Sequence, residues 1–200
     1  MAPSFTSAII ALLLTLAPSV TPLTEKPPSE LSGGVVSRLT PAAKIALGPA
    51  TLDLWLVSKL ESTGPGWSGV DSGTLVGALR VSGEFKEIRG KVVKPGVYTL
   101  RYGLQPQNGD HLGISTFREF LLLSPAAIDK DPKVLGFDGV VALSKEVIGT
   151  AHPASLSLDP PEDAPGAVLS TYKNEHGHEG VVLQIGSVKF GLIVSGLIVH

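Results

Sequence analysis

The chain contains no cysteine among its 200 residues, and this absence removes several classes of protein at once. Disulfide-stapled scaffolds, thiolate metal sites and enzymes with a cysteine nucleophile are all excluded. Without such a staple the fold depends on an apolar core. A single domain of this length is large enough to bury one.

The sequence also lacks a concentration of charge of either sign. Its 16 basic and 18 acidic residues are interspersed, and the formal net charge is −2. A nucleic-acid-binding protein normally carries a basic stripe that neutralises phosphates, and a protein held on anionic lipid carries a Lys/Arg cluster. Neither pattern is present, so we expect no nucleic-acid partner.

The apolar run near the N-terminus is shorter than the roughly 20 residues that a membrane-spanning helix needs. It covers Ala8–Ala17 and leads into Ala17-Pro18-Ser19, a small-x-small stretch suited to signal peptidase. The pattern predicts a signal peptide over residues 1–22, hence a periplasmic or secreted protein with no membrane span in the mature chain. The N-terminal region has no Lys or Arg, and a buried apolar segment is the alternative interpretation. An exported chain without cysteine is more typical of a bacterial envelope than of a eukaryotic extracellular space.

After the predicted signal peptide, residues 23–44 are weakly patterned and rich in Pro, Ser and Gly, which predicts a flexible N-terminal tail. Residues 45–200 are then expected to form a single domain. The chain holds 23 glycines and 16 prolines, a composition that favours many short strands joined by tight turns. Alternating apolar residues predict strands at 52–61, 75–81 with a continuation at 85–88, 97–104, 117–123, 154–158, 167–172, 180–185 and 188–199.

The strand at 97–104 has the clearest alternation, with Tyr98, Leu100, Tyr102 and Leu104 on one face and Thr99 and Arg101 on the other. Lys94-Pro95-Gly96 predicts a type II turn before it, in which Gly96 takes a positive φ. Gly186-Ser187 predicts a two-residue hairpin.

One helix is expected at 139–148, capped by Asp138 and ended by Gly149. Together the elements predict a mainly β protein, an antiparallel β-sandwich of jelly-roll or immunoglobulin-like type with one short helix. A distorted barrel is the alternative.

Four short patterns resemble a block found in uncharacterised exported bacterial proteins. They are Pro95-Gly96-Val97-Tyr98-Thr99-Leu100, Gly109-Asp110-His111-Leu112-Gly113, Arg118-Glu119-Phe120-Leu121-Leu122 and the later His152-Pro153. The resemblance covers about a third of the chain. It implies an export signal and a β-rich domain but no known activity, so it assigns no catalytic residue.

Histidines are the candidate metal ligands in a chain without cysteine. Asp110 and His111 lie in the loop after the 97–104 strand, and His152 follows the predicted helix. If the two loops meet at one end of the fold, they supply two imidazoles and a carboxylate for a divalent metal. The alternative is that Asp110 bonds to nearby backbone and His111 is structural or exposed. His176 and His178 form a second concentration, for which a solvated hairpin loop is the alternative.

No catalytic residue is predicted, because no Gly-x-Ser-x-Gly motif or phosphate-binding glycine loop in a strand–helix context is present. Trp67, in the Gly-rich loop 63–73, is the candidate ligand-binding aromatic, either exposed or folded back over the sheet. We therefore expect an exported, non-catalytic binding or accessory domain of the cell envelope, without a cofactor. Its partner would be an envelope protein or a small ligand. The alternative is a small metal-binding protein that uses His111 and His152.

Overall fold

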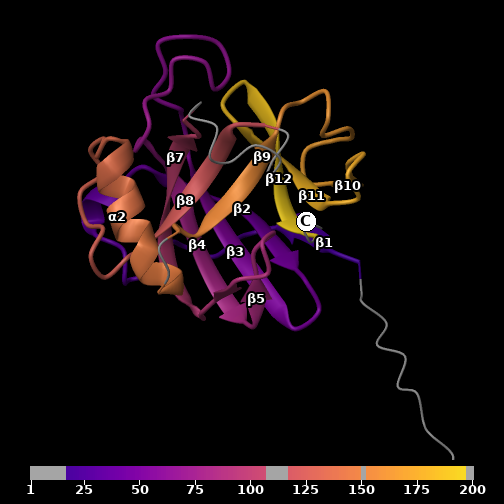
Figure 1. The fold of residues 1–200 in the computed structure, drawn as a ribbon, viewed down its shortest axis with the longest axis horizontal. Helices are drawn as coiled ribbons and strands as arrows, with labels where there is room; N and C mark the ends of the chain where they lie inside the picture. Colours follow the sequence, from indigo (N-terminus) through magenta and orange to yellow (C-terminus); the bar gives the residue numbers. More distant parts are fainter. Residues whose placement is uncertain (1–16, 107–116, 150–151, 197–200) are drawn as a thin grey trace, which may run out of the picture.

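A computed structural model describes residues 17–106, 117–149 and 152–196 (Figure 1). Ten of the strands found there form one antiparallel sheet in the order β1-β2-β3-β4-β7-β8-β9-β12-β11-β10, and β5 pairs with β6 in a separate hairpin. The elements are β1 Ser19–Pro22, α1 Gly33–Val36, β2 Leu39–Ala46, β3 Ala50–Val57, β4 Leu75–Gly83, β5 Phe85–Lys86, β6 Val92–Val93, β7 Gly96–Leu104, β8 Glu119–Pro125, α2 Phe137–Ile148, β9 Ser155–Asp159, β10 Thr171–Lys173, β11 Glu179–Ile185 and β12 Val188–Ser195.

The prediction of a mainly β, antiparallel protein is confirmed, and the sheet curls until its two ends come close together (Figure 1). Residues of β2 and of β11 line the same small groove, which shows how near the ends are. The sequence predicts one helix, whereas the described part of the chain contains two, because α1 precedes β2. Neither helix in the described ranges has the length and apolar composition that crossing a membrane requires.

Several local predictions are confirmed at residue level. Gly186 and Ser187 form the hairpin turn that places Ile185 opposite Val188. Gly149 takes the left-handed conformation, with a φ of 62°, at the end of α2. Each position combines a tight reversal of the chain with a glycine that adopts positive φ without steric cost.

Other local predictions are wrong. Helix α2 starts at Phe137 behind the N-cap Gly136, so Asp138 lies in the first turn and is not the cap. Gly96 is the first residue of β7, opposite Val81, and has no positive φ. The segment 85–88, predicted to continue the preceding strand, contains β5, which pairs with β6. The strand predicted at 167–172 begins only at Thr171, as β10.

The predicted tail at 23–44 is also wrong, because this segment contains α1 and most of β2. Leu23, Leu31 and Val35 are buried in the core. The last four residues of the predicted signal peptide form β1, where Ser19 pairs with Ala46. The folded unit therefore begins well before residue 45, since its N-terminal residues cover the sheet.

We call residues 23–32 the N-terminal strap, because they lie across the outer face of β3 and β4. The indole N–H of the buried Trp55 donates a hydrogen bond to the backbone carbonyl of Glu25 (2.8 Å). The Arg80 guanidinium donates to Glu25 (2.6 Å) and also pairs with Asp53, and its carbon lies 5.4 Å from the centroid of the Trp55 ring. An outward tryptophan is thus covered by a second layer of chain.

The inner face of the curved sheet is built from the alternating leucines. Cross-strand neighbours there include Leu54 with Leu79 and Leu100 with Leu123. Leu158 faces Leu192 on the other side of β9, and all these side chains belong to one apolar cluster. Burying a leucine side chain contributes about 1.5–3 kcal/mol, so this face is the main source of stability.

The outer face of β7 is buried as well, although it carries the polar residues Thr99 and Arg101, which normally indicate a face exposed to solvent. Thr99 and Arg101 are fully buried because a stretch we call the cover segment, residues 126–136, passes over them. Arg101 binds both carboxylate oxygens of Asp129 at 2.7 Å. Its remaining N–H groups donate to the backbone carbonyls of Gly73, Asp131 and Lys133, so all five donors are used.

Replacing Arg101 by Met should lower the free energy of unfolding by about 3–5 kcal/mol, because the Asp129 carboxylate then remains buried without its partner. Arg38→Met, which removes an exposed ion pair, should cost less than about 1 kcal/mol. Urea denaturation of the two variants measures both. Adding Asp129→Leu to Arg101→Met should recover part of the loss, whereas equal costs for Arg101→Met and Arg38→Met would contradict the assigned role.

Candidate functional site

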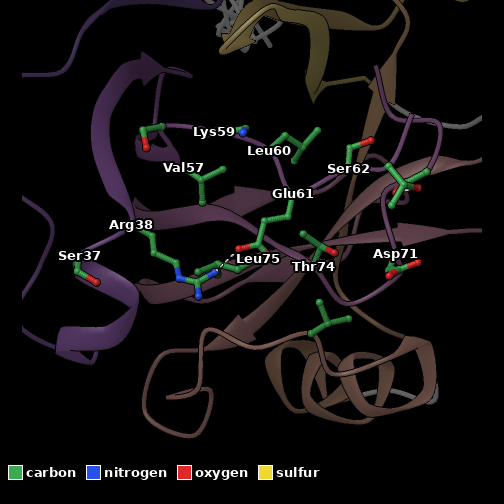
Figure 2. A pocket seen from close by; sticks show the side chains of 14 residues that line it. Ser37, Arg38, Val57, Lys59, Leu60, Glu61, Ser62, Asp71, Thr74 and Leu75 are labelled. Atoms are coloured by element: carbon green, nitrogen blue, oxygen red, sulfur yellow. Dashed lines mark hydrogen bonds and ion pairs between the residues drawn. The ribbon is translucent and has the colours of Figure 1, made fainter. Parts of the chain in front are cut away.

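A cleft of ≈ 650 Å³ lies where the end of α1, the end of β3 and the loop from residue 58 to residue 74 meet (Figure 2). The cover segment contributes Val134 to its rim. The volume lies in the range of about 300–1,000 Å³ that is typical of small-molecule sites. The lining residues are Ser37, Arg38, Val57, Ser58, Lys59, Leu60, Glu61, Ser62, Thr63, Gly69, Asp71, Thr74, Leu75 and Val134.

Arg38 and Glu61 form an ion pair in this cleft. Figure 2 shows the two side chains reaching toward each other, and Arg38 Nη1 lies 2.7 Å from Glu61 Oε1. The Arg38 and Glu61 side chains remain 40% and 63% exposed, so both heads are reachable from solvent. Asp71 lies across the cleft from Arg38 (Figure 2). The pair therefore offers donors and acceptors side by side to an incoming molecule.

The backbone on either side of the pair is fixed by hydrogen bonds. Arg38 follows α1, and its carbonyl accepts from the N–H of Ser58 (3.2 Å). The Ser62 hydroxyl binds the carbonyl of Ser68 (2.9 Å), and the N–H of Thr63 donates to the carbonyl of Gly69 (3.0 Å). These hydrogen bonds connect the two ends of the 62–69 loop. The loop residues that line the cleft are therefore held in place by backbone contacts.

The apolar part of the cleft comes from strand ends and the cover segment. Val57, Leu60 and Leu75 are buried at the base of the cleft. Val134, which also lines the cleft, is 44% exposed. The cleft thus combines an aliphatic base with a polar rim.

Trp67, the predicted ligand-binding residue, folds back over the end of the sheet. Its ring stacks on Tyr102 (centroids 5.3 Å apart, 5° between planes) and meets Phe190 edge-on at 5.1 Å. The ring is half-buried, its Nε1 is buried without a hydrogen-bond partner in the described structure, and it does not line the cleft. Burial under this stack raises the pKa of Tyr102 to about 12. A ligand contact by Trp67 stays a prediction.

The predicted metal ligands are not brought together in the parts that the structure describes. Asp110 and His111 lie outside those parts, and His152 is exposed just before β9. His176 and His178 lie in the turn between β10 and β11 with ring centroids 6.1 Å apart. No group of three potential ligands occurs within residues 17–106, 117–149 and 152–196. The metal site of His111, His152 and Asp110 therefore stays a prediction.

A buried carboxylate outside the cleft, that of Asp159, lies at the end of β9. Asp159 is 4% exposed, and its Oδ2 accepts hydrogen bonds from the Tyr172 hydroxyl (2.9 Å) and the Asn174 amide (3.1 Å). Burial raises the pKa of Asp159, and the two donors oppose that shift only in part. No motif marks this group, because its partners come from a strand and a turn farther along the chain.

Because the pKa of Asp159 is raised on folding, the folded state holds its proton more tightly than the unfolded chain. Its contribution to stability should fall as pH rises from the usual aspartate value of 3.8 through the raised value. The free energy of unfolding of Asp159→Asn should therefore rise relative to that of the parent protein over a pH range that begins near 4. Urea denaturation across this range measures it. The same measurement on Glu162→Gln, a change at an exposed neighbour, is the control, and a flat profile for Asp159→Asn would refute the shift.

Comparison with known proteins adds no assignment: no family model, no curated protein and no solved structure matches this chain. The resemblance to uncharacterised exported bacterial proteins stays a prediction.

The residues of the cleft come from segments far apart in sequence. Arg38 lies in the segment predicted as a tail, and Glu61 lies at the end of a predicted strand. No spacing motif connects them, so only the pairing of β2 with β3 brings them into contact.

Proposed function

We propose that this chain is an exported, non-catalytic binding domain of the cell envelope that holds a small molecule in the cleft around Arg38 and Glu61. The observation that supports it most directly is the cleft itself, whose ≈ 650 Å³ combine a solvent-accessible ion pair with an aliphatic base. Concave sites with a few convergent polar groups are the usual form of small-molecule sites.

A pre-organised site supports binding because little ordering is needed when the ligand arrives. The 62–69 loop is closed by its own hydrogen bonds, and Ser58 holds the backbone of Arg38. The Arg101–Asp129 pair fixes the cover segment, from which Val134 reaches the cleft. The segments that line the cleft are therefore held by hydrogen bonds, either to other segments or within their own loop.

The chemistry of the lining favours a binding role over a catalytic one. Its ionisable side chains are two cations and two carboxylates, and the described lining includes no histidine. Arg38 and Glu61 are engaged with each other, and the Ser62 hydroxyl is engaged with the backbone. None of these groups forms the nucleophile–base arrangement that covalent catalysis uses.

We further propose that the curved sheet is best regarded as a β-sandwich joined by one strand. Strand β9 pairs through Ser155–Ser157 with β8 and through Leu158–Asp159 with β12. A strand that changes partner in this way turns a corner between two packed sheets. The leucines of both halves belong to the same apolar cluster, as a sandwich core requires.

To test the binding site, a library of sugars, amino acids, nucleotides and divalent metal salts is screened by thermal shift. At least one compound should raise the melting temperature, because a ligand that binds only the folded state stabilises it. That shift should be lost in Arg38→Ala and Glu61→Ala. It should persist in Glu84→Gln, which removes a comparable exposed ion pair with Lys86 outside the cleft. A shift retained in all three variants would contradict the assignment of the site.

The export proposal rests on the apolar run at residues 8–17 and the small residues after it. Because Val20 pairs with Ile45, processing should leave the chain from Val20 onward in the mature protein. Expression with the native N-terminus in a bacterial host, followed by fractionation and N-terminal mass spectrometry, should find processed protein outside the cytoplasm. Intact Met1–Ala17 on soluble cytoplasmic protein would contradict export.

A further inference from the structure

We propose that the ligand of the cleft is a neutral saccharide, an inference that rests on the proposed binding function. Its first support is the charge of the lining. Arg38 and Lys59 are balanced by Glu61 and Asp71, so the four ionisable side chains give no net charge. Sites for anionic or cationic ligands concentrate one sign of charge, which raises the local ligand concentration. This cleft offers no such advantage to a phosphate, a nucleotide or a polyamine.

The second support is the kind of hydrogen bonding that the cleft provides. A sugar hydroxyl donates one hydrogen bond and accepts others, so a ring with neighbouring hydroxyls needs donors and acceptors close together. The Arg38–Glu61 contact uses one guanidinium nitrogen and one carboxylate oxygen. Further N–H groups and lone pairs of the same two side chains are left for hydroxyls. Ser37 and Ser58 also line the cleft.

The third support is the aliphatic part of the cleft. Saccharides present patches of C–H groups between their hydroxyls, and these patches bind best to apolar surface. Leu60 and Leu75 supply such a surface at the base, and Val134 supplies it at the rim while remaining 44% exposed. A sugar can use the remaining N–H groups and lone pairs of Arg38 and Glu61 and leave their ion pair intact.

The full-length purified protein is titrated with maltotriose and cellotriose as neutral saccharides, glucose 6-phosphate as an anion and trialanine as a zwitterion, each followed by NMR chemical-shift changes. At least one neutral saccharide should bind, with an affinity that is unchanged between low and high salt because no ionic contact to the ligand forms. Arg38→Ala and Glu61→Ala should each weaken this binding by about tenfold or more, since each removes hydrogen bonds from a charged group.

Two further variants separate the possible outcomes. Val134→Ser should weaken saccharide binding while leaving the fold intact, because the side chain is exposed. Glu84→Gln should change nothing, because it lies outside the cleft. Binding of trialanine or glucose 6-phosphate that depends on Arg38, without binding of either saccharide, would overturn the saccharide proposal and keep the cleft as the site. Saccharide binding that survives both Arg38→Ala and Glu61→Ala would overturn the site itself, and no binding of either saccharide at millimolar concentration would overturn the saccharide proposal.

Discussion

The buried ion pair between Arg101 and Asp129 is the interaction on which the rest of the structure depends. A guanidinium without water needs every N–H group satisfied, and Arg101 achieves this with one bidentate carboxylate and three backbone carbonyls. Those partners come from the loop before β4 and from the cover segment. A single side chain on β7 therefore decides where two irregular stretches of chain lie.

The cover segment that Arg101 holds also contacts the N-terminal strap and lines the cleft. The Lys130 ammonium donates to the carbonyl of Glu30 (2.9 Å), and the Ser32 hydroxyl donates to the carbonyl of Lys130 (2.6 Å). The cover segment that Arg101 holds thus also fixes the start of α1, after which Arg38 enters the cleft. The same segment contributes Val134 to the lining of the cleft. The site is assembled from loops, but the loops are attached to a rigid sheet.

The sheet has apolar packing on its inner face, and its outer face combines apolar contacts, such as Val182 with Ile193, with polar networks. Three outer networks centre on buried or nearly buried carboxylates: Asp53 with Arg80, Asp129 with Arg101, and Asp159 with Tyr172. Removing one partner of a buried pair leaves an unsatisfied group, so such networks permit few alternative arrangements of the covering chain. They give the loops a defined position that apolar contacts alone would specify less sharply.

The sequence by itself determined the strands that alternate clearly and the inner core they form, because a period of two in leucine and tyrosine, as at Tyr98–Leu104, is a local property of the chain. It did not determine β1 and β2, which lie in segments without such alternation. It also determined the Gly186-Ser187 hairpin and the end of α2 at Gly149, where the glycine conformation is set locally. The order of the strands, the burial of Thr99 and Arg101 and the contact of Arg38 with Glu61 were decided only by the tertiary structure. The strap and the cover segment carry no periodic pattern. Their positions depend on partners many residues away, such as Glu25 for Trp55 and Asp129 for Arg101. Local propensity contains no information about such pairs, since a hydrogen bond between distant residues depends on how the whole chain folds.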